Sequence, residues 1–215
     1  MLEIYSPYLS DRERIADIST FMIAGHDTTA YQLSWIIIEL SRNPDVVSKL
    51  RLELDALFPC RQYSNVAFTP QHLSKLNYLT SVIKEGMRLW PVAAIGTSRL
   101  VAADIPCGDK IIPKGAVASI GFFAMFRAGI RDPHDFIPGR WADTDPDAAK
   151  LKELSFPFST GKRACIGQNL ALLELKLVLA TLVYSYDFEL VSDVSEMYYI
   201  TLKPQNANFR VSKRP

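Results

Sequence analysis

The longest regular pattern of apolar and polar residues lies near the start of the chain, over residues 11–41. Its apolar side chains recur every three or four residues, which is the spacing of one face of an α-helix. They are Ile15, Ile18, Phe21, Met22, Leu33, Ile36, Ile37 and Leu40. Ser10 and Glu13 stand where a capping box closes a helix N-terminus, and Asn43-Pro44 marks the end. The pattern predicts one helix of about 45 Å, long enough to cross a larger body.

Other segments have helical spacing, and two regions have the short β-branched runs of strands. The predicted helices cover 44–57, a short stretch capped by Thr69-Pro70, 76–89 and 168–186. Residues 94–123 predict a small sheet, and residues 188–211 predict a terminal hairpin. Residues 131–147 are rich in Pro and Asp and predict an irregular connection. The sequence shows no repeat or linker, so the pattern predicts one mainly α unit with a minor β part.

Composition narrows the function classes without selecting one. Apolar residues make up 48% of the 215 residues and charged residues 22%, as in proteins that bury a core. The net charge of +1 gives no reason to expect a nucleic-acid partner. Cys60, Cys107 and Cys165 have neither disulfide-framework nor zinc-ligand spacing, which indicates an intracellular protein. No apolar run reaches the ~18 residues of a membrane span, and no signal peptide is readable at the start.

A polar segment interrupts the apolar pattern of the first helix at AGHDTTA, residues 24–30. Asp and Thr side chains can bond carbonyls of the preceding turn and bend a helix. A lone DTT triplet is most often a solvated patch. Apolar residues flank this one on both sides, however, and burying polar groups without a partner is costly. The pattern therefore favours a local break that places Asp27 and Thr28 beside a ligand, with Gly25 allowing close approach.

Glu85 and Arg88 lie three residues apart in the predicted helix over 76–89 and therefore share one face. By itself this pair predicts only a weak ion pair, because ExxR occurs in many helices. Arg140, in the irregular connection, offers a third partner. Two arginines with bidentate geometry around one carboxylate would fix a loop to a helix. The three residues therefore predict a structural triad.

The stretch FPFSTGKRACIG, residues 156–167, places Cys165 immediately before the predicted helix over 168–186. Thiolates are stabilised at helix N-termini and beside cations such as Arg163. Gly161 and Gly167 suit either a positive φ or a flat object lying close to the backbone. A buried structural residue is the usual role of a single cysteine. The full register of the stretch favours instead a thiolate that binds a metal.

These segments resemble the motifs of one family, the cytochrome P-450 monooxygenases. Its haem-binding loop, FxxGxRxCxG, matches Phe158, Gly161, Arg163, Cys165 and Gly167. The AGHDTT segment resembles the family's AGxDTT oxygen-binding motif, KEGMR contains its ExxR, and FIPGRW resembles its FxPERF or FxPERW. All four segments occur in the family's order. The resemblance covers nearly the whole chain, and the cysteine loop is its most specific part.

The resemblance implies haem b as cofactor, with Cys165 as the thiolate ligand whose electron donation favours O–O cleavage. It implies proton delivery on the opposite side of the haem by Thr28 with Asp27. Arg163 and Arg99 are implied partners of the haem propionates. The implied reaction is hydroxylation of a small, apolar organic substrate with O₂ and two electrons from a reductase.

Two features depart from the family pattern. Gly139 replaces the usual glutamate of PERF although Arg140 is kept, and residues 125–141 form a shorter connection than usual. The family's chains are also much longer than this one. Residues 1–215 are therefore expected to be the C-terminal fragment of one P-450 domain. The expected fragment contains a long central helix, the ExxR helix, a small sheet, the haem-cysteine loop and the helix that follows it.

Three functions stay open on these residues. The first is the monooxygenase. The second is a haem-thiolate enzyme that rearranges peroxides, against which the Asp27-Thr28 pair argues. The third is a non-catalytic, truncated remnant that cannot hold haem alone. The resemblance also suggests a parent enzyme anchored in a membrane of the endoplasmic reticulum type, with membrane association only through an N-terminal anchor.

Overall fold

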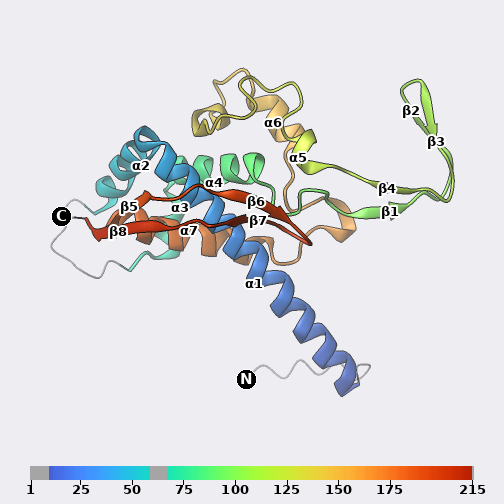
Figure 1. Cartoon of the computed structure of the whole chain (residues 1–215), viewed down its shortest axis with the longest axis horizontal. Helices are drawn as coiled ribbons and strands as arrows, with labels where there is room; N and C mark the ends of the chain where they lie inside the picture. The colour runs from blue at the N-terminus through green and yellow to red at the C-terminus, as the bar shows by residue number, and fades with distance from the viewer. Residues whose placement is uncertain (1–9, 59–66, 215) are drawn as a thin grey trace.

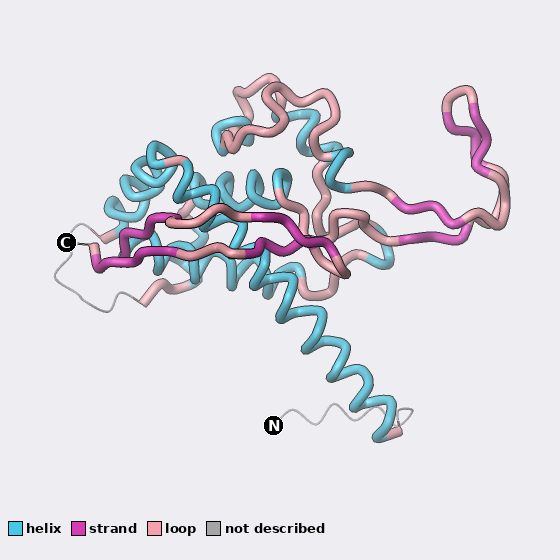
Figure 2. Tube along the Cα trace, viewed as in Figure 1, coloured by secondary structure: helices cyan, strands magenta, loops and turns pink. Residues whose placement is uncertain are grey.

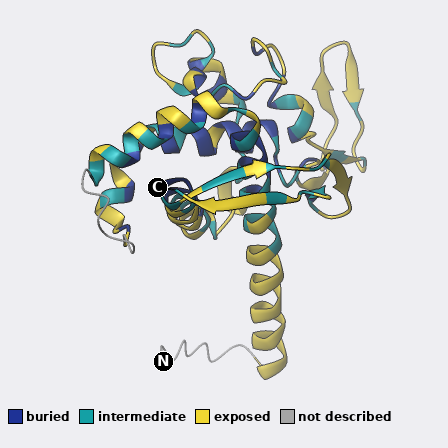
Figure 3. Ribbon diagram, turned by 60° about the vertical axis from the view of Figure 1, so that its left-hand side comes forward, coloured by how far each residue is buried: buried dark blue, intermediate teal, exposed yellow. Residues whose placement is uncertain are grey.

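Helix α1 (Asp11–Arg42) dominates the outline of the computed structural model, which describes residues 10–58 and 67–214 (Figures 1 and 2). The predicted capping box is present. The Glu13 amide donates to Ser10 Oγ at 3.3 Å, and the Ser10 amide donates to Glu13 Oε2 at 2.8 Å. The first half of α1 extends away from the rest of the chain (Figure 3), and its buried positions begin at Gln32.

The second half of α1 packs against the helices α2 (Pro44–Leu57), α4 (Asn77–Leu89) and α7 (Gln168–Ser185). The short helix α3 (Pro70–Ser74) is capped by Thr69 as predicted and lies against α7. All these helices begin and end close to the predicted bounds. Their apolar stripes meet in one core, which includes Ile36, Leu40, Leu50, Leu54, Leu79, Val82, Leu179 and Val183. Each such side chain stabilises the fold by about 1.5–3 kcal/mol when fully buried, so these stripes hold the helices together.

The predicted small sheet is a hairpin nested within a second hairpin, which projects from the body in Figure 1. Strand β1 (Ser98–Leu100) pairs with β4 (Val117–Ser119), and β2 (Ile105–Cys107) pairs with β3 (Lys110–Ile112), both antiparallel. Gly108 lies at the turn of the inner hairpin with a φ of +60°, a conformation that favours glycine.

The predicted terminal hairpin is confirmed and consists of two successive antiparallel ladders. They pair β5 (Tyr186–Leu190) with β8 (Phe209–Lys213), and β6 (Ser195–Tyr198) with β7 (Leu202–Gln205). The hairpin lies along α1, where Trp35 Nε1 donates to the Leu202 carbonyl at 3.1 Å. The Leu190 amide donates to Ser41 Oγ at 2.7 Å. These bonds fix the tail to the buried half of α1.

The chain between β4 and α7 is largely irregular, as predicted for residues 131–147. It contains the short elements α5 (Phe122–Met125), η1 (Pro138–Trp141), α6 (Ala148–Leu154) and η2 (Gly161–Arg163). The sequence pattern did not predict α6, and the predicted sheet region over residues 94–123 is wrong at its end, because α5 begins at Phe122. The mainly α architecture with a minor β part is confirmed.

One local prediction is wrong. Helix α1 continues through residues 24–30 without the predicted break. The Thr28 hydroxyl donates to the Ala24 carbonyl at 2.7 Å, and this bond is accommodated without interrupting the helix. Across residues 10–58 and 67–214, no helix is both long and apolar enough to cross a membrane.

Candidate functional site

Cys165 lies in a loop, and hydrogen bonds hold its backbone on both sides of the residue. Its amide donates to the Phe158 carbonyl at 2.9 Å, and its own carbonyl accepts the Gln168 amide at 3.4 Å. Gly161 has a φ of +73°, so the positive φ expected of a loop glycine is present at this position. Gly167 has a φ of −83° and is the N-cap of α7. The loop therefore holds Cys165 at a defined position directly before the helix.

The Cys165 thiol is free and exposed. A Cβ added to Gly167 would lie 3.8 Å from Cys165 Sγ, so the glycine leaves the space beside the sulfur open. The next residue, Ile166, is 84% exposed, and Leu170 on the first turn of α7 is 63% exposed. An accessible sulfur beside uncovered apolar side chains is what a flat, apolar, metal-containing group requires. Cys107 is also free and exposed, whereas Cys60 lies outside the described residues.

Arg163 and Arg99 are both exposed. Arg163 ends η2, two residues before Cys165. Arg99 lies in β1 and donates to the Ser98 carbonyl at 2.9 Å. Within the described part of the chain, neither guanidinium forms a salt bridge with a carboxylate. Both are therefore available to an anionic group.

The structure brings Glu85, Arg88 and Arg140 together, with all three side chains fully buried. Arg88 donates from both Nε and an Nη to the Glu85 carboxylate, each at 2.9 Å, which is the bidentate geometry. Arg140 Nε donates to Glu85 Oε1 at 2.9 Å. The second Nη of Arg88 donates to the Pro133 carbonyl at 2.8 Å, so the same cluster holds the irregular connection.

Three further members of this cluster were not predicted from the sequence. Trp141 Nε1 donates to Glu85 Oε2 at 2.8 Å, and the Ile137 amide donates to Glu85 Oε1 at 3.0 Å. Asp147 Oδ2 accepts a bond from Arg140 at 3.1 Å and so neutralises part of the second arginine. The tryptophan directly after Arg140 was the available signal. Nothing in the spacing of Asp147 indicated its role.

The polar segment of α1 is not buried. Asp27 and Thr28 are partly exposed, and His26 Nδ1 lies 2.9 Å from Asp27 Oδ1. A Cβ added to Gly25 would meet nothing within 4 Å among the described residues. The preceding turns expose the apolar side chains Ile15, Ile18, Phe21, Met22 and Ile23. The segment thus presents an acid and a hydroxyl beside open space, and no hydrogen bond within the described ranges joins it to the Cys165 loop.

Comparison with known proteins decides the family. The family model described as "Cytochrome P450" matches residues 4–208. The chain belongs to the cytochrome P450 family. The P450 monooxygenase BOT4 of Botryotinia fuckeliana is 39% identical to it over 186 residues, which are 86% of this chain and 34% of BOT4. The mitochondrial 25-hydroxyvitamin D-1 alpha hydroxylase of Rattus norvegicus is 36% identical over 86% of this chain and 36% of its own length.

Solved P450 structures confirm the fold. The crystal structure of the P450 CYP102L1 superposes with a TM-score of 0.83 at 29% identity, covering 96% of this chain and 46% of that one. A mutant P450DA haem domain has a TM-score of 0.86 at 27% identity, covering 96% of this chain and 45% of that one. The chain spans about a third of the length of the curated relatives named above, BOT4 and the rat hydroxylase. Membership of the family implies a haem-thiolate cofactor in general terms, and the residues around Cys165 fit that group.

Proposed function

We propose that the chain is the haem-binding part of a haem-thiolate monooxygenase and that Cys165 is the thiolate ligand of haem b. The exposed, free thiol on a loop fixed by Phe158 is the observation that carries this proposal. Gly167 keeps the space beside the sulfur clear. Arg163 and Arg99 are the proposed partners of the two propionates, because both are exposed cations without a carboxylate partner in the described chain. No acidic or histidine cluster among the described residues offers a competing metal site.

When bound through a thiolate, haem supplies the oxygen chemistry that lets O₂ insert one atom into a C–H bond. The proposed overall reaction converts R–H, O₂, two electrons and two protons into R–OH and water. The electrons come from a reductase. The chain contributes the ligand, the propionate contacts and a route for protons.

We assign the proton route to Asp27 and Thr28. Asp27 is half-exposed and can exchange protons with solvent at its carboxylate, and His26 Nδ1 lies beside it. The Thr28 hydroxyl donates a hydrogen bond to the Ala24 carbonyl, and its oxygen lone pairs can still accept a hydrogen bond from another group. Gly25 lets a flat group approach the helix, because an added Cβ would stand in otherwise open space. A small, apolar substrate is consistent with the apolar side chains exposed on the same half of α1.

The triad Glu85, Arg88 and Arg140 has a structural role in this proposal. It fixes the connection over residues 131–141 to helix α4. Gly139, which replaces the family's usual glutamate, leaves Arg140 paired with Glu85 and Asp147. We further propose that residues 1–215 form the C-terminal part of one P450 domain, and that the parent enzyme is associated with a membrane.

A second candidate is a remnant that packs but cannot hold haem. The exposed apolar half of α1 favours it, because side chains such as Met22 at 70% exposure and Ile23 at 69% have no cover in the described chain. A peroxide-rearranging enzyme stays a weaker alternative, since it does not need the Asp27-Thr28 pair.

Haem titration of the purified chain tests these functions. The monooxygenase proposal predicts stoichiometric haem uptake and the red-shifted Soret band of a thiolate-ligated, reduced, CO-bound haem. Cys165→Ala is expected to abolish that band, whereas the matched variant Cys107→Ala is expected to keep it. Absence of haem uptake by the wild-type chain would favour the remnant. A thiolate band together with peroxide rearrangement, and without hydroxylation, would favour the third function.

A further inference from the structure

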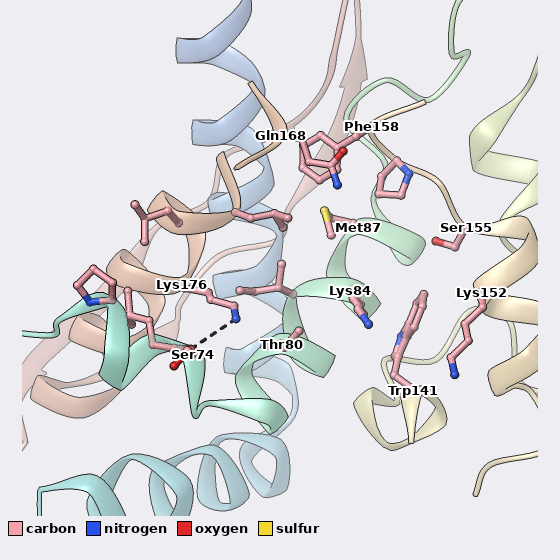
Figure 4. A pocket seen from close by; sticks show the side chains of 16 residues that line it. Ser74, Thr80, Lys84, Met87, Trp141, Lys152, Ser155, Phe158, Gln168 and Lys176 are labelled. Carbon is pink, nitrogen blue, oxygen red and sulfur yellow. Dashed lines mark hydrogen bonds between the residues drawn. The ribbon is translucent and has the colours of Figure 1, made fainter. Parts of the chain in front are cut away.

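A cleft of about 580 Å³ lies between helices α3, α4 and α7 and the segment that leads to Cys165 (Figure 4). Its walls are largely apolar and include Leu73, Ile83, Met87, Phe158 and Leu172. Pockets that bind small molecules commonly measure 300–1,000 Å³ and combine apolar walls with a few polar groups. The cleft therefore has the size and lining of a small-molecule site. Its walls come from helices that pack into the core, so its shape is fixed by the fold.

The polar groups of the cleft are strongly biased toward positive charge. Lys84 from α4, Lys176 from α7 and Lys152 from α6 line it, and no acidic side chain does so within the described chain. Lys152 is neutralised, because its Nζ lies 2.7 Å from Asp143 Oδ1. Lys84 and Lys176 form no salt bridge among the described residues. Two ammonium groups that form no salt bridge among the described residues therefore face one apolar cleft from different helices (Figure 4).

The contacts of these two amines are weak. Lys84 Nζ lies 5.5 Å from the centre of the Trp141 ring, and Lys176 Nζ donates to the Leu73 carbonyl at 3.5 Å. Burial lowers the pKa of Lys176, Glu53 opposes this shift, and the charge of Lys84 adds to it. Glu53 is already engaged, because its carboxylate accepts the Tyr78 and Leu79 amides at 2.7 and 2.9 Å. An anion placed between the two lysines would relieve their repulsion and complete their hydrogen bonding.

We propose that this cleft binds a small organic carboxylate with an apolar body, the body against Phe158, Met87 and Leu172 and the carboxylate between Lys84 and Lys176. The site is distinct from the Cys165 thiol and does not depend on the proposed haem chemistry. Phe158 connects the two places, because its ring lines the cleft while its carbonyl accepts the Cys165 amide. Charge complementarity selects the acid, and the apolar walls select against small hydrophilic anions.

Calorimetric titration of the full chain with 2-naphthoate tests the proposal, with 2-naphthalenemethanol as a neutral probe of similar shape. Saturable one-to-one binding of the carboxylate is expected, with the alcohol about tenfold weaker, because a charge-assisted hydrogen bond is lost. Lys84→Met and Lys176→Met are each expected to weaken naphthoate binding by about tenfold. Lys150→Met is the matched control and is expected to change the affinity by less than about twofold, because Lys150 lies on the same helix α6 but outside the cleft, where its Nζ donates to the Gly129 carbonyl.

Lys84→Arg and Lys176→Arg keep the charge and are expected to retain most of the affinity. This pair keeps the test decisive if a methionine variant does not fold. Equal affinities of the acid and the alcohol, or unchanged affinity in the Lys84 and Lys176 variants, would overturn the proposal and indicate binding to another exposed apolar face. Tight binding of an oligoglutamate peptide without binding of naphthoate would also overturn it, since the cleft would then be part of a protein-docking surface.

Discussion

Glu85 and Asp27 are both acids on helices and both belong to motifs of the P450 family, yet they lie in opposite environments. Glu85 is fully buried with Arg88 and Arg140, and its two oxygens accept five hydrogen bonds. The Asp27 side chain is 49% exposed and lies beside His26, whose side chain is 82% exposed. The triad is therefore complete within this chain, whereas the segment around Asp27 presents its polar groups to open space.

The difference separates two kinds of motif. A buried ion cluster contributes to the fold, because removing one partner leaves an uncompensated charge in a medium that solvates it poorly. An exposed acid and hydroxyl contribute little to folding, which agrees with the proposal that they serve a ligand. Changes at the triad should therefore act on stability, and changes near Asp27 should act on haem binding or activity.

Replacing Glu85 by Ala is expected to have the largest effect. The change leaves two buried guanidinium groups without their shared carboxylate and removes the acceptor of the Trp141 indole. Breaking a buried ion pair typically costs about 3–5 kcal/mol, so the free energy of unfolding should fall by that amount. Urea denaturation followed by circular dichroism measures it. Glu189→Ala is the control, since its pair with Arg210 is exposed and should cost less than about 1 kcal/mol. Equal losses in the two variants would show that burial of the Glu85 cluster adds nothing to its stabilising effect.

Two glycine substitutions, one in α4 beside Glu85 and one in α1 beside Asp27, test how tightly each region is packed. Gly86 lies in α4, where an added Cβ would overlap the side chain of the fully buried Ile36. Gly86→Ala is therefore expected to destabilise the chain by about 1–3 kcal/mol, despite the better helix propensity of alanine. Gly25→Ala meets open space and is expected to stabilise α1 by about 0.5–1 kcal/mol.

Thermal unfolding measures the stability of these two variants, and haem titration measures their affinity for haem. If haem lies against α1 as proposed, Gly25→Ala should raise the melting temperature and weaken haem uptake in the same protein. Stabilisation with unchanged haem affinity would contradict the proposed place of Gly25. The double variant Gly86→Ala/Ile36→Ala should lose less stability than the sum of the losses in the two single variants, because truncating Ile36 removes the atoms that the added methyl group overlaps.

The helices and their ends were predictable because their signals are local. Ser10 with Glu13 and Thr69 with Pro70 define helix starts through hydrogen bonds that span only three residues or through a fixed φ. The pairing of Arg140 with Glu85 spans 55 residues, and it was predicted because a carboxylate can bind two arginines and the irregular connection offers the second one. Asp147 could not be predicted, because its contact depends on how the irregular connection folds back.

The predicted break at residues 24–30 was wrong because it, too, depends on tertiary packing and not on local sequence. A threonine hydroxyl that bonds the carbonyl four residues earlier is compatible with a bent helix and with a continuous one. The sequence cannot distinguish them, because the choice depends on what packs against the helix. The lysines of the cleft could not be predicted for a related reason. Lys84 and Lys176 are 92 positions apart and line one cleft only because α4 packs on α7.

Asp145 offers a smaller and pH-dependent test at the edge of the buried cluster. The Asp147 amide donates to its carboxylate at 2.9 Å, and this bond, with Arg131, lowers the pKa of Asp145 below its usual value of 3.8. A carboxyl with a lowered pKa stabilises the fold above its unfolded-state pKa and loses that contribution as the pH falls through its folded-state pKa. Asp145→Asn should therefore cost less than about 1 kcal/mol at pH 7. The difference from wild type should shrink below pH 3.8, as urea titrations at several pH values would show.

Thr28→Val is expected to have the smallest effect on folding. The hydroxyl bonds only the Ala24 carbonyl of its own helix, and valine has nearly the same shape, so the free energy of unfolding should change by less than about 0.5 kcal/mol. If Thr28 delivers protons, the haem-loaded variant should consume reductant without forming a matching amount of hydroxylated product. Thr28→Ser restores the hydroxyl and should restore the ratio of product to reductant consumed. A Thr28→Val protein that is as stable and as tightly coupled as wild type would assign the hydroxyl to the helix alone, because the Ala24 bond is the other role that the structure gives it.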